Sequence, residues 1–362
     1  MLDKNKDKNF LIPICLILLL VIGLFALYSA SYSKSLLDKT INYAFIQLRW
    51  IVVGLVSIGI VFLINYKRLL EISYIVYVIN IILLVLVILI HRQEAGAHRW
   101  LSFLGINFQP SEFMKLVIIL TLARYLSSHK YEESNLKTIL ISFGIVFLPL
   151  FLIIKQPDLG TALIFIPVLF VMIYIWGCRL RYIITTLLMG VILSPLLWCF
   201  LKDYQKERLL VFINPNIDPL GAGYTIIQSK IAIGSGGILG KGFLQGTQNQ
   251  LNFLPEHHTD FIFSCIGEEW GLIGALIIIV LYFIVIWEGF NIAQESSLME
   301  RKLLAAGIST LIMLHVIINI CMSIGLMPVV GLPLPFISYG GSHIVVFMIM
   351  IGILLNIKYK KG

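Results

Sequence analysis

Charged residues are scarce in this sequence: Asp, Glu, Lys and Arg make up 13% of its 362 residues. Soluble domains are about one-quarter charged, so this chain has too few charges to cover the surface of a soluble globule. Hydrophobic residues make up 59% of the chain, which also excludes an intrinsically disordered protein. The composition therefore predicts a polytopic membrane protein, provided that the hydrophobic residues form runs of about 20.

Cysteine is also scarce, and the five cysteines lie far apart, in or beside hydrophobic runs. Without short Cys-to-Cys spacings, neither a zinc site nor a disulfide framework is indicated. The net charge of +8 is compatible with nucleic-acid binding, but the basic residues lie mostly in short connections between hydrophobic runs. There they determine membrane orientation and contact anionic lipid, so no nucleic-acid partner is expected.

Ten hydrophobic runs are long enough to form membrane helices. Their continuous hydrophobicity differs from the alternation of barrel strands, and only helices and closed barrels cross lipid. The sequence therefore predicts an all-α polytopic membrane protein with ten transmembrane helices, in a single domain that spans residues 1–362. The runs are 10–30, 46–65, 72–90, 113–127, 137–154, 159–177, 181–200, 267–288, 303–325 and 343–357.

Basic residues of the short connections gather on the side of the N-terminus, as Arg179 and Arg181 illustrate. This bias places the N-terminus in the cytoplasm, and an even number of spans places the C-terminus there as well. Residues 201–266 then form one long extracellular loop between the seventh and eighth helices. Loops of this length usually have a function, so we expect the active face to be the outer one.

Three outer segments have unusual patterns. Residues 224–243 place Tyr224, Ile227, Ile231 and Ile238 on one helical face, which predicts a helix lying at the membrane interface. The glycine cluster 234–242 lacks the spacing of a phosphate-binding loop, so close helix packing or turns are expected. Residues 325–342 are too rich in proline and glycine for a regular helix and must be buried in protein or line a wet cavity.

Asp260 lies where the polar loop becomes the eighth hydrophobic run. A carboxylate at a membrane boundary is costly unless it is solvated or paired, which makes Asp260 a candidate functional residue. Alternatively, Thr259 or Asp260 caps the eighth helix. Glu256, His257 and His258 nearby favour a polar pocket. Adjacent histidines on a helix point about 100° apart, so His257 and His258 are not expected to bind one metal ion together.

Other candidates also have structural alternatives. Asp158 either caps the sixth helix or contributes to a site. Glu112 and Lys115, three residues apart, form an ion pair or face a polar cavity. Trp100, next to Arg99, is either an interface anchor or a platform on which a sugar stacks.

Four further polar residues lie within the predicted spans. Of the adjacent pair Glu268 and Glu269, one is expected to face protein and the other the lipid headgroups. His315 and Asn319 are four residues apart, which predicts a hydrogen bond to another helix.

Several segments together resemble the SEDS family of bacterial shape, elongation, division and sporulation proteins, and are closer to its elongation branch than to its division branch. The sequence departs from the family pattern at Thr225 and His343, neither of which is expected to take part in chemistry. The matching segments are GLFALYSAS (23–31), HRW with QPSEFMKL (98–116), KQPDLGTAL (155–163), DPLGAGY with QSKIAIGSGG (218–237), LPEHHTDFIFSCIGEEWG (254–271) and GLPLPFISYGGS (331–342).

The resemblance implies a peptidoglycan glycosyltransferase that polymerises lipid II into β-1,4 glycan strands at the outer face of the bacterial cytoplasmic membrane. It also implies a class B penicillin-binding protein as partner and Asp260 as the catalytic residue. Alternative functions are a lipid II flippase and the division-specific member of the same family.

The implied reaction inverts the anomeric carbon, which requires a base and stabilisation of the departing pyrophosphate. Asp260 would accept the proton of the acceptor hydroxyl. The leaving group needs cations, supplied by basic side chains or by a divalent metal, Mg²⁺ or Mn²⁺, held with Glu112 or Asp158. The candidate basic residues are Arg99, Lys115, Lys155, Arg208 and Lys241.

Overall fold

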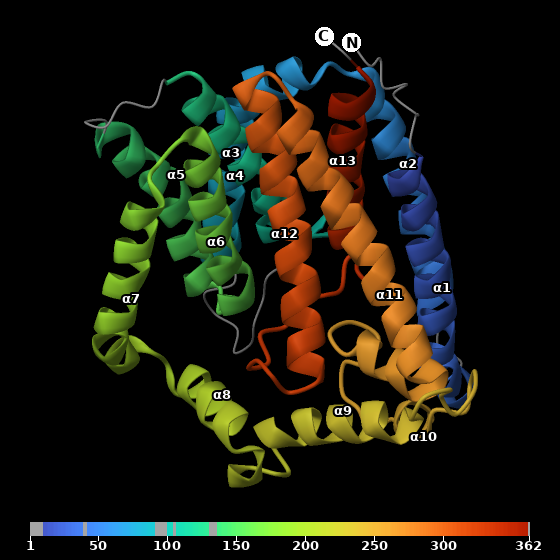
Figure 1. The fold of residues 1–362 in the computed structure, drawn as a ribbon. Helices are drawn as coiled ribbons and strands as arrows, with labels where there is room; N and C mark the ends of the chain where they lie inside the picture. The colour runs from blue at the N-terminus through green and yellow to red at the C-terminus, as the bar shows by residue number, and fades with distance from the viewer. Residues whose placement is uncertain (1–9, 39–41, 91–99, 104–105, 130–135, 361–362) are drawn as a thin grey trace.

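The computed structural model describes residues 10–38, 42–90, 100–103, 106–129 and 136–360. Eight of its helices are long and apolar enough to cross a membrane, which confirms a helical polytopic membrane protein. The long helices pack side by side (Figure 1). They are α1 (Leu11–Asp38), α2 (Tyr43–Leu63), α3 (Tyr66–Ile90), α4 (Pro110–Ser127), α5 (Leu136–Lys155), α6 (Leu159–Trp176), α7 (Leu180–Phe200), α11 (Ile262–Glu295), α12 (Met299–Ser323) and α13 (Gly341–Tyr359).

Each of the ten predicted hydrophobic runs lies on one of these helices, to within a few residues. The helices α4 and α7 are not among the eight that qualify as spans. Helix α4 carries Glu112, Lys115 and Arg124, too many charges for a helix that faces lipid. The uninterrupted apolar part of α7 is short and covers Leu180–Leu196.

The two ends of the described chain lie at the same end of the bundle (Figure 1). The rings of Phe10, just before α1, and Tyr359, at the end of α13, have centroids 6.2 Å apart. The segment between α7 and α11 covers the opposite end of the bundle. This arrangement agrees with an even number of crossings and with one long segment on the far side.

The long segment folds into short helices: α8 (Asp203–Ile213), the 3₁₀ helix η1 (Pro215–Ile217), α9 (Ala222–Gly236) and α10 (Thr247–Gln250). Helix α9 lies across the end of the bundle (Figure 1), which confirms a helix that does not cross the membrane. It ends at Gly236, whereas the predicted helical segment extended to residue 243. Its buried side includes Ile226 and Ala232, whereas Ile231, on the predicted apolar face, is exposed.

The glycine cluster 234–242 packs against a kink in α11. Gly271 has φ = 65° and interrupts the helical backbone. The amides of residues 272 and 273 donate to the carbonyls of residues 237 and 238, at 2.9 and 3.2 Å. A Cβ at Gly240 would lie 2.1 Å from the carbonyl oxygen of Glu269. The glycines therefore serve close packing, as predicted.

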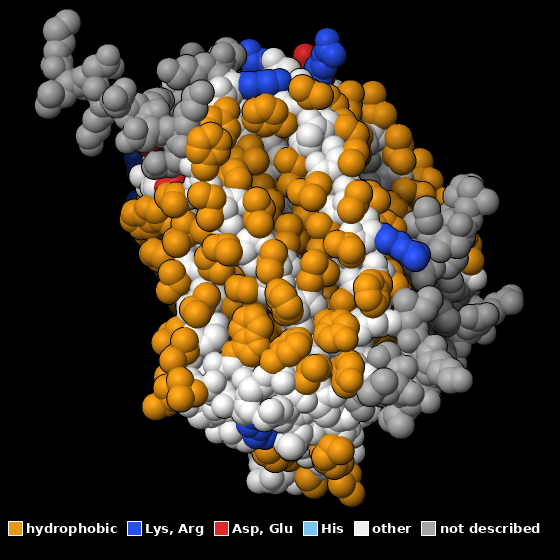
Figure 2. Space-filling view, turned by 90° about the vertical axis from the view of Figure 1, so that its right-hand side faces the viewer, with side chains coloured by type: hydrophobic (Ala, Val, Ile, Leu, Met, Phe, Trp, Pro, Cys, Tyr) orange, Lys and Arg blue, Asp and Glu red, His pale blue; other side chains and the backbone are white. Residues whose placement is uncertain are grey.

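Helices α4, α12 and α13 form the buried centre of the bundle. Hydrophobic side chains cover the side of the bundle drawn in Figure 2, with few charged residues among them. In lipid, polar side chains gain by turning inward, where protein groups can satisfy them. Asn356 of α13 illustrates this, because its Nδ2 donates to the carbonyls of Val61, Phe62 and Ile64, at 3.0, 3.0 and 2.6 Å.

One element departs from the all-helical prediction. The strands β1 (Leu101–Phe103) and β2 (Ile106–Phe108) form an antiparallel pair between α3 and α4. Strands of three residues are too short to produce a recognisable alternation in the sequence. The pair leads directly into Pro110, at the start of α4, and so helps to position the first turn of that helix.

Candidate functional site

Asp260 lies in a tight turn directly before α11. Its backbone amide donates to the carbonyl of Glu256 at 3.1 Å. The N-cap residue of α11 is Phe261, which makes no side-chain capping hydrogen bond. The alternative that Thr259 or Asp260 occupies the N-cap position of this helix is therefore wrong.

Three consecutive carbonyls, those of residues 258–260, are held by other parts of the chain. They accept hydrogen bonds from Tyr339 N at 3.0 Å, Ser338 Oγ at 2.6 Å and Asn319 Nδ2 at 2.9 Å. Asn319 also donates to the carbonyl of Leu332 at 2.7 Å. The expected bond from Asn319 to another helix is wrong, since both of its acceptors are carbonyls outside helices. Its position fastens the Asp260 turn to the connection between α12 and α13.

A cavity of about 630 Å³ opens beside this turn. The proline- and glycine-rich connection between α12 and α13 forms part of its wall, as predicted. Seven predicted candidates line it: Trp100, Glu112, Asp158, Arg208, Glu256, His258 and Asp260. The rest of the lining is Tyr43, Ile46, Trp50, Gln109, Thr161, Thr259, Val330, Gly331, Pro333, Tyr339, Gly340, Gly341 and His343.

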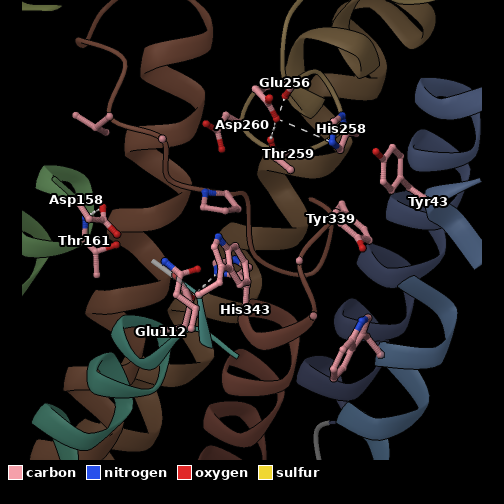
Figure 3. A pocket seen from close by; sticks show the side chains of 18 of the residues that line it. Tyr43, Glu112, Asp158, Thr161, Glu256, His258, Thr259, Asp260, Tyr339 and His343 are labelled. Atoms are coloured by element: carbon pink, nitrogen blue, oxygen red, sulfur yellow. Dashed lines mark hydrogen bonds and ion pairs between the residues drawn. The ribbon is translucent and has the colours of Figure 1, made fainter. Parts of the chain in front are cut away.

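Glu112 lies on the opposite side of the cavity from Asp260 (Figure 3). Lys115 Nζ is 2.6 Å from Glu112 Oε1, and His343 Nδ1 is 2.9 Å from Glu112 Oε2. Glu112 and Lys115 therefore form the predicted ion pair, and Glu112 also faces the cavity. Both are buried, and Lys115 itself does not line the cavity. His343 was not expected to touch any candidate site residue, and its contact with Glu112 shows that this expectation is wrong. Its only sequence signal is its departure from the family pattern.

Asp158 caps a helix, as one of its two predicted alternatives had it, and it also lies at the cavity. Its Oδ1 accepts a hydrogen bond from the backbone amide of Thr161 at 3.2 Å, so it caps α6. Both residues also line the cavity, on a third side (Figure 3). Trp100 lines the cavity and is 43% exposed, so its indole is accessible to a sugar ring.

Aromatic side chains hold His258 at the edge of the cavity. Its ring stacks on Tyr43, with centroids 4.4 Å apart and planes 2° apart. Tyr339 lies 4.9 Å from Tyr43, ring to ring. Burial, and secondarily the neighbouring Tyr43, raises the pKa of the Tyr339 hydroxyl above its ordinary value, so that hydroxyl remains neutral. None of these aromatic partners was predicted.

His257 does not line the cavity, so the expectation that it contributes to the polar pocket is wrong. It is buried, with Nδ1 2.7 Å from the carbonyl oxygen of Leu254 and Nε2 2.9 Å from that of Ala30. His257 therefore joins the turn to α1 and has a structural role.

The basic residues that are candidates for stabilising the leaving group lie in different parts of the structure. Arg208 lines the cavity. Lys241 does not, because its Nζ is 2.7 Å from Glu268 Oε1. Lys155 lies over the ring of Phe151 instead. Arg99 lies outside the described residues. Among the candidates whose positions are described, Arg208 is thus the one that lines the cavity.

Glu268 and Glu269 are both buried, so the expectation that one faces the headgroups is wrong. Besides Lys241, Glu268 accepts bonds from Thr247 Oγ1 at 3.1 Å and from the amide of Gln248 at 3.0 Å. Glu269 accepts a bond from Ser29 Oγ. Glu268 therefore clamps α10 and the lysine onto α11, and Glu269 joins α11 to α1. The sequence did not indicate these contacts because the partners are distant along the chain.

Within the described parts of the chain, no group of three His, Cys, Asp or Glu side chains is placed to hold a metal ion. A divalent cation stays a prediction.

The family follows from comparison with known proteins. The model of the cell cycle protein family that includes FtsW, RodA and SpoVE matches residues 9–362. The chain belongs to the SEDS family of peptidoglycan glycosyltransferases. Within this SEDS chain, the cavity draws residues from α2, α4, α6, α8, α13 and the segments before α11 and α13.

SEDS relatives and a solved structure extend over most of the chain. Peptidoglycan glycosyltransferase MrdB of Escherichia coli is 45% identical over 264 residues, covering 72% of this chain and 71% of MrdB. Peptidoglycan glycosyltransferase RodA of Treponema pallidum is 32% identical and covers 98% of each chain. A chain of a peptidoglycan synthase complex, described as coordinating polymerization and crosslinking, has a TM-score of 0.80 at 28% identity. The match covers 97% of this chain and 98% of that chain.

Proposed function

We propose that the cavity is the site at which this chain polymerises lipid II, with Asp260 as the general base. One observation carries the proposal: Asp260, Asp158 and Glu112 come from separate elements to a single cavity, together with Arg208. Carboxylates are scarce in this membrane protein, and ionisable groups placed near lipid are usually functional.

In the proposed reaction, a sugar hydroxyl of the acceptor attacks the anomeric carbon of the donor. The new glycosidic bond forms as the bond to the lipid pyrophosphate breaks, and the hydroxyl proton passes to the Asp260 carboxylate. A single displacement inverts the anomeric centre. Arg208 is the described cavity cation that would compensate the departing negative charge.

We further propose that all ten long helices cross the bacterial cytoplasmic membrane, with both termini in the cytoplasm and the cavity open to the outer leaflet. The shared end of Phe10 and Tyr359 supports this orientation. The charged residues of α4 do not oppose crossing, since Glu112 and Lys115 are covered by neighbouring helices. The lipid tails of the substrates would lie against the exposed apolar sides of the bundle.

We also propose a role in cell elongation and a class B penicillin-binding protein as partner. The segments HHTDFIF (257–263) and GLMPVVGLPLPF (325–336) support the elongation role. The likeness to a chain of a synthase complex that coordinates polymerization and crosslinking supports a crosslinking partner.

Polymerisation of lipid II by the purified full-length protein tests the assignment of Asp260. We expect the Asp260→Asn and Asp260→Ala variants to lose about 10²- to 10⁴-fold in rate, the usual contribution of a general base. Asp203→Asn serves as the control, because Asp203 is an exposed acid of the same outer segment. Polymerisation near the wild-type rate by folded Asp260 variants would disprove the assignment. Movement of lipid II across sealed vesicles without polymer would instead support a flippase.

A further inference from the structure

His343, in the first turn of α13, is a cavity residue to which the chemistry above assigns no role. The residue lines the cavity and is 3% exposed. Nδ1 lies 2.9 Å from Glu112 Oε2. Nε2 is buried and has no hydrogen-bond partner among the described residues. A buried polar atom without a partner is costly, so this nitrogen requires an explanation.

The contact with Glu112 determines which ring nitrogen carries the proton. Lys115 Nζ is 2.6 Å from the other oxygen of Glu112, so the carboxylate is ionised and can only accept hydrogen bonds. Nδ1 of His343 is therefore the donor. Lys115 and Glu112 already form a neutral pair, and a second buried positive charge on the ring would lack a counter-ion. The neutral ring thus has a lone pair on Nε2, ready to accept a hydrogen bond.

The protein neighbours do not supply the missing donor. The ring of His315, on α12, is centred 5.4 Å from that of His343. Its Nδ1 faces the carbonyl oxygen of Pro333 at 3.3 Å, which leaves its own Nε2 as an acceptor without a partner in the described structure. Two acceptors cannot satisfy each other. The third ring of the group, Phe347, is centred 4.6 Å from His343 and has no polar hydrogen.

We propose that His343 is a substrate-binding residue whose Nε2 accepts a hydrogen bond from a hydroxyl or amide N–H of the sugar in the cavity. A pyrophosphate offers acceptors only, so the neutral imidazole selects the sugar part of the substrate. Glu112 acts as a positioning residue, since its carboxylate fixes the orientation and tautomer of the ring, as carboxylates do for other functional histidines. This inference rests on the proposed function of the cavity.

Two amide variants separate the two nitrogens of the ring. In His343→Asn the side-chain amide reaches the position of Nδ1 and keeps the bond to Glu112, but the acceptor at Nε2 is lost. In His343→Gln the amide reaches the position of Nε2 and keeps an acceptor there. We expect His343→Asn to raise KM for lipid II about tenfold, the effect of one lost hydrogen bond, with kcat nearly unchanged. His343→Gln should stay within about threefold of the wild-type KM.

The opposite order, with His343→Gln impaired and His343→Asn normal, would show that the ring only supports Glu112 and would overturn the proposal. Equal effects of the two variants, whether large or absent, would overturn it as well. His129→Gln is the matched control, because His129 is exposed and does not line the cavity. Thermal unfolding establishes that each variant is folded.

Binding measurements distinguish this inference from the assignment of Asp260. Lipid II binding is measured with Asp260→Asn, alone and combined with His343→Asn. A roughly tenfold weaker Kd in the double variant supports the role of His343 even if Asp260 proves not to be the base. An unchanged Kd overturns the role of His343 and leaves the test of Asp260 unaffected.

Discussion

Asn319 Nδ2 lies 2.9 Å from the carbonyl oxygen of Asp260. The same nitrogen donates to Leu332 in the connection before α13. One fully buried amide on α12 therefore joins two walls of the cavity without lining it. The position of the Asp260 carboxylate depends on this helix as well as on α11.

Replacement of this amide should loosen the Asp260 turn. We expect Asn319→Ala to lower the free energy of unfolding by about 1–3 kcal/mol, since buried carbonyls lose their donor. We also expect turnover to fall at least about tenfold, because small displacements of a catalytic group are costly. Thermal unfolding and lipid II polymerisation measure the two effects.

Asn356→Ala is the matched control, since Asn356 also donates to backbone carbonyls but lies far along α13, near its C-terminal end. It should lose similar stability while the folded fraction keeps its activity. Equal activities of the two variants would argue against a positioning role for Asn319.

Gly331 should be required next to the Asp260 carboxylate. It has φ = +71°, and a Cβ there would lie 3.3 Å from Asp260 Oδ2. Gly331→Ala should cost about 1–2 kcal/mol of backbone strain and also reduce polymerisation. Gly237→Ala has a similar φ of +58° but open space around the new Cβ, so it should lose stability only. Normal polymerisation by Gly331→Ala would refute the prediction.

The Lys241–Glu268 clamp should show strong coupling. Lys241→Met leaves a fully buried carboxylate without its cation, which should destabilise the protein by about 3–5 kcal/mol. The double variant Lys241→Met/Glu268→Gln should be more stable than Lys241→Met, because no uncompensated charge remains. Thermal unfolding gives the coupling, and hydrogen exchange reports local opening of 237–250. The exposed Glu207→Gln is the control. Additive effects would contradict a clamp.

The stack between Tyr43 and His258 should position the His258 ring for substrate. Tyr43→Phe keeps the ring-to-ring contact of 4.4 Å and should retain nearly full activity. Tyr43→Ala removes a contact worth about 0.5–1.5 kcal/mol, which corresponds to a rise in KM of about 2- to 12-fold. If Tyr43→Phe and Tyr43→Ala raise KM equally in steady-state kinetics, the hydroxyl matters and the stack does not.

The positions of the long helices could be predicted because lipid imposes a local requirement. Each crossing segment must be continuously apolar and must satisfy its own backbone, so the pattern is visible in any window of the sequence. The outer helix α9 was predicted from a different local signal, the helical spacing of its apolar residues. Which of its sides is buried was not predicted correctly. The strands β1 and β2 left no signal, since each has only three residues.

The candidate site was predictable residue by residue but not as an assembly. Asp158 shows this: the sequence indicated either a cap or a site residue, and in the structure it caps α6 and also lines the cavity. Lys241 was a candidate for stabilising the negative charge of the leaving group. Only the structure shows that it pairs with Glu268 instead. A charge in a loop has many reachable partners, and its sequence neighbours do not select one.

The sequence by itself determined that this chain is a helical membrane protein of the SEDS family, because hydrophobicity and motifs are read along the chain. Only the tertiary structure decided which polar groups meet. Glu112 and His343 are 231 residues apart in sequence and 2.9 Å apart in space. Their meeting depends on how α4 and α13 pack at the centre of the bundle. Such packing is set by the shapes of many side chains together, and no local pattern in the sequence specifies it.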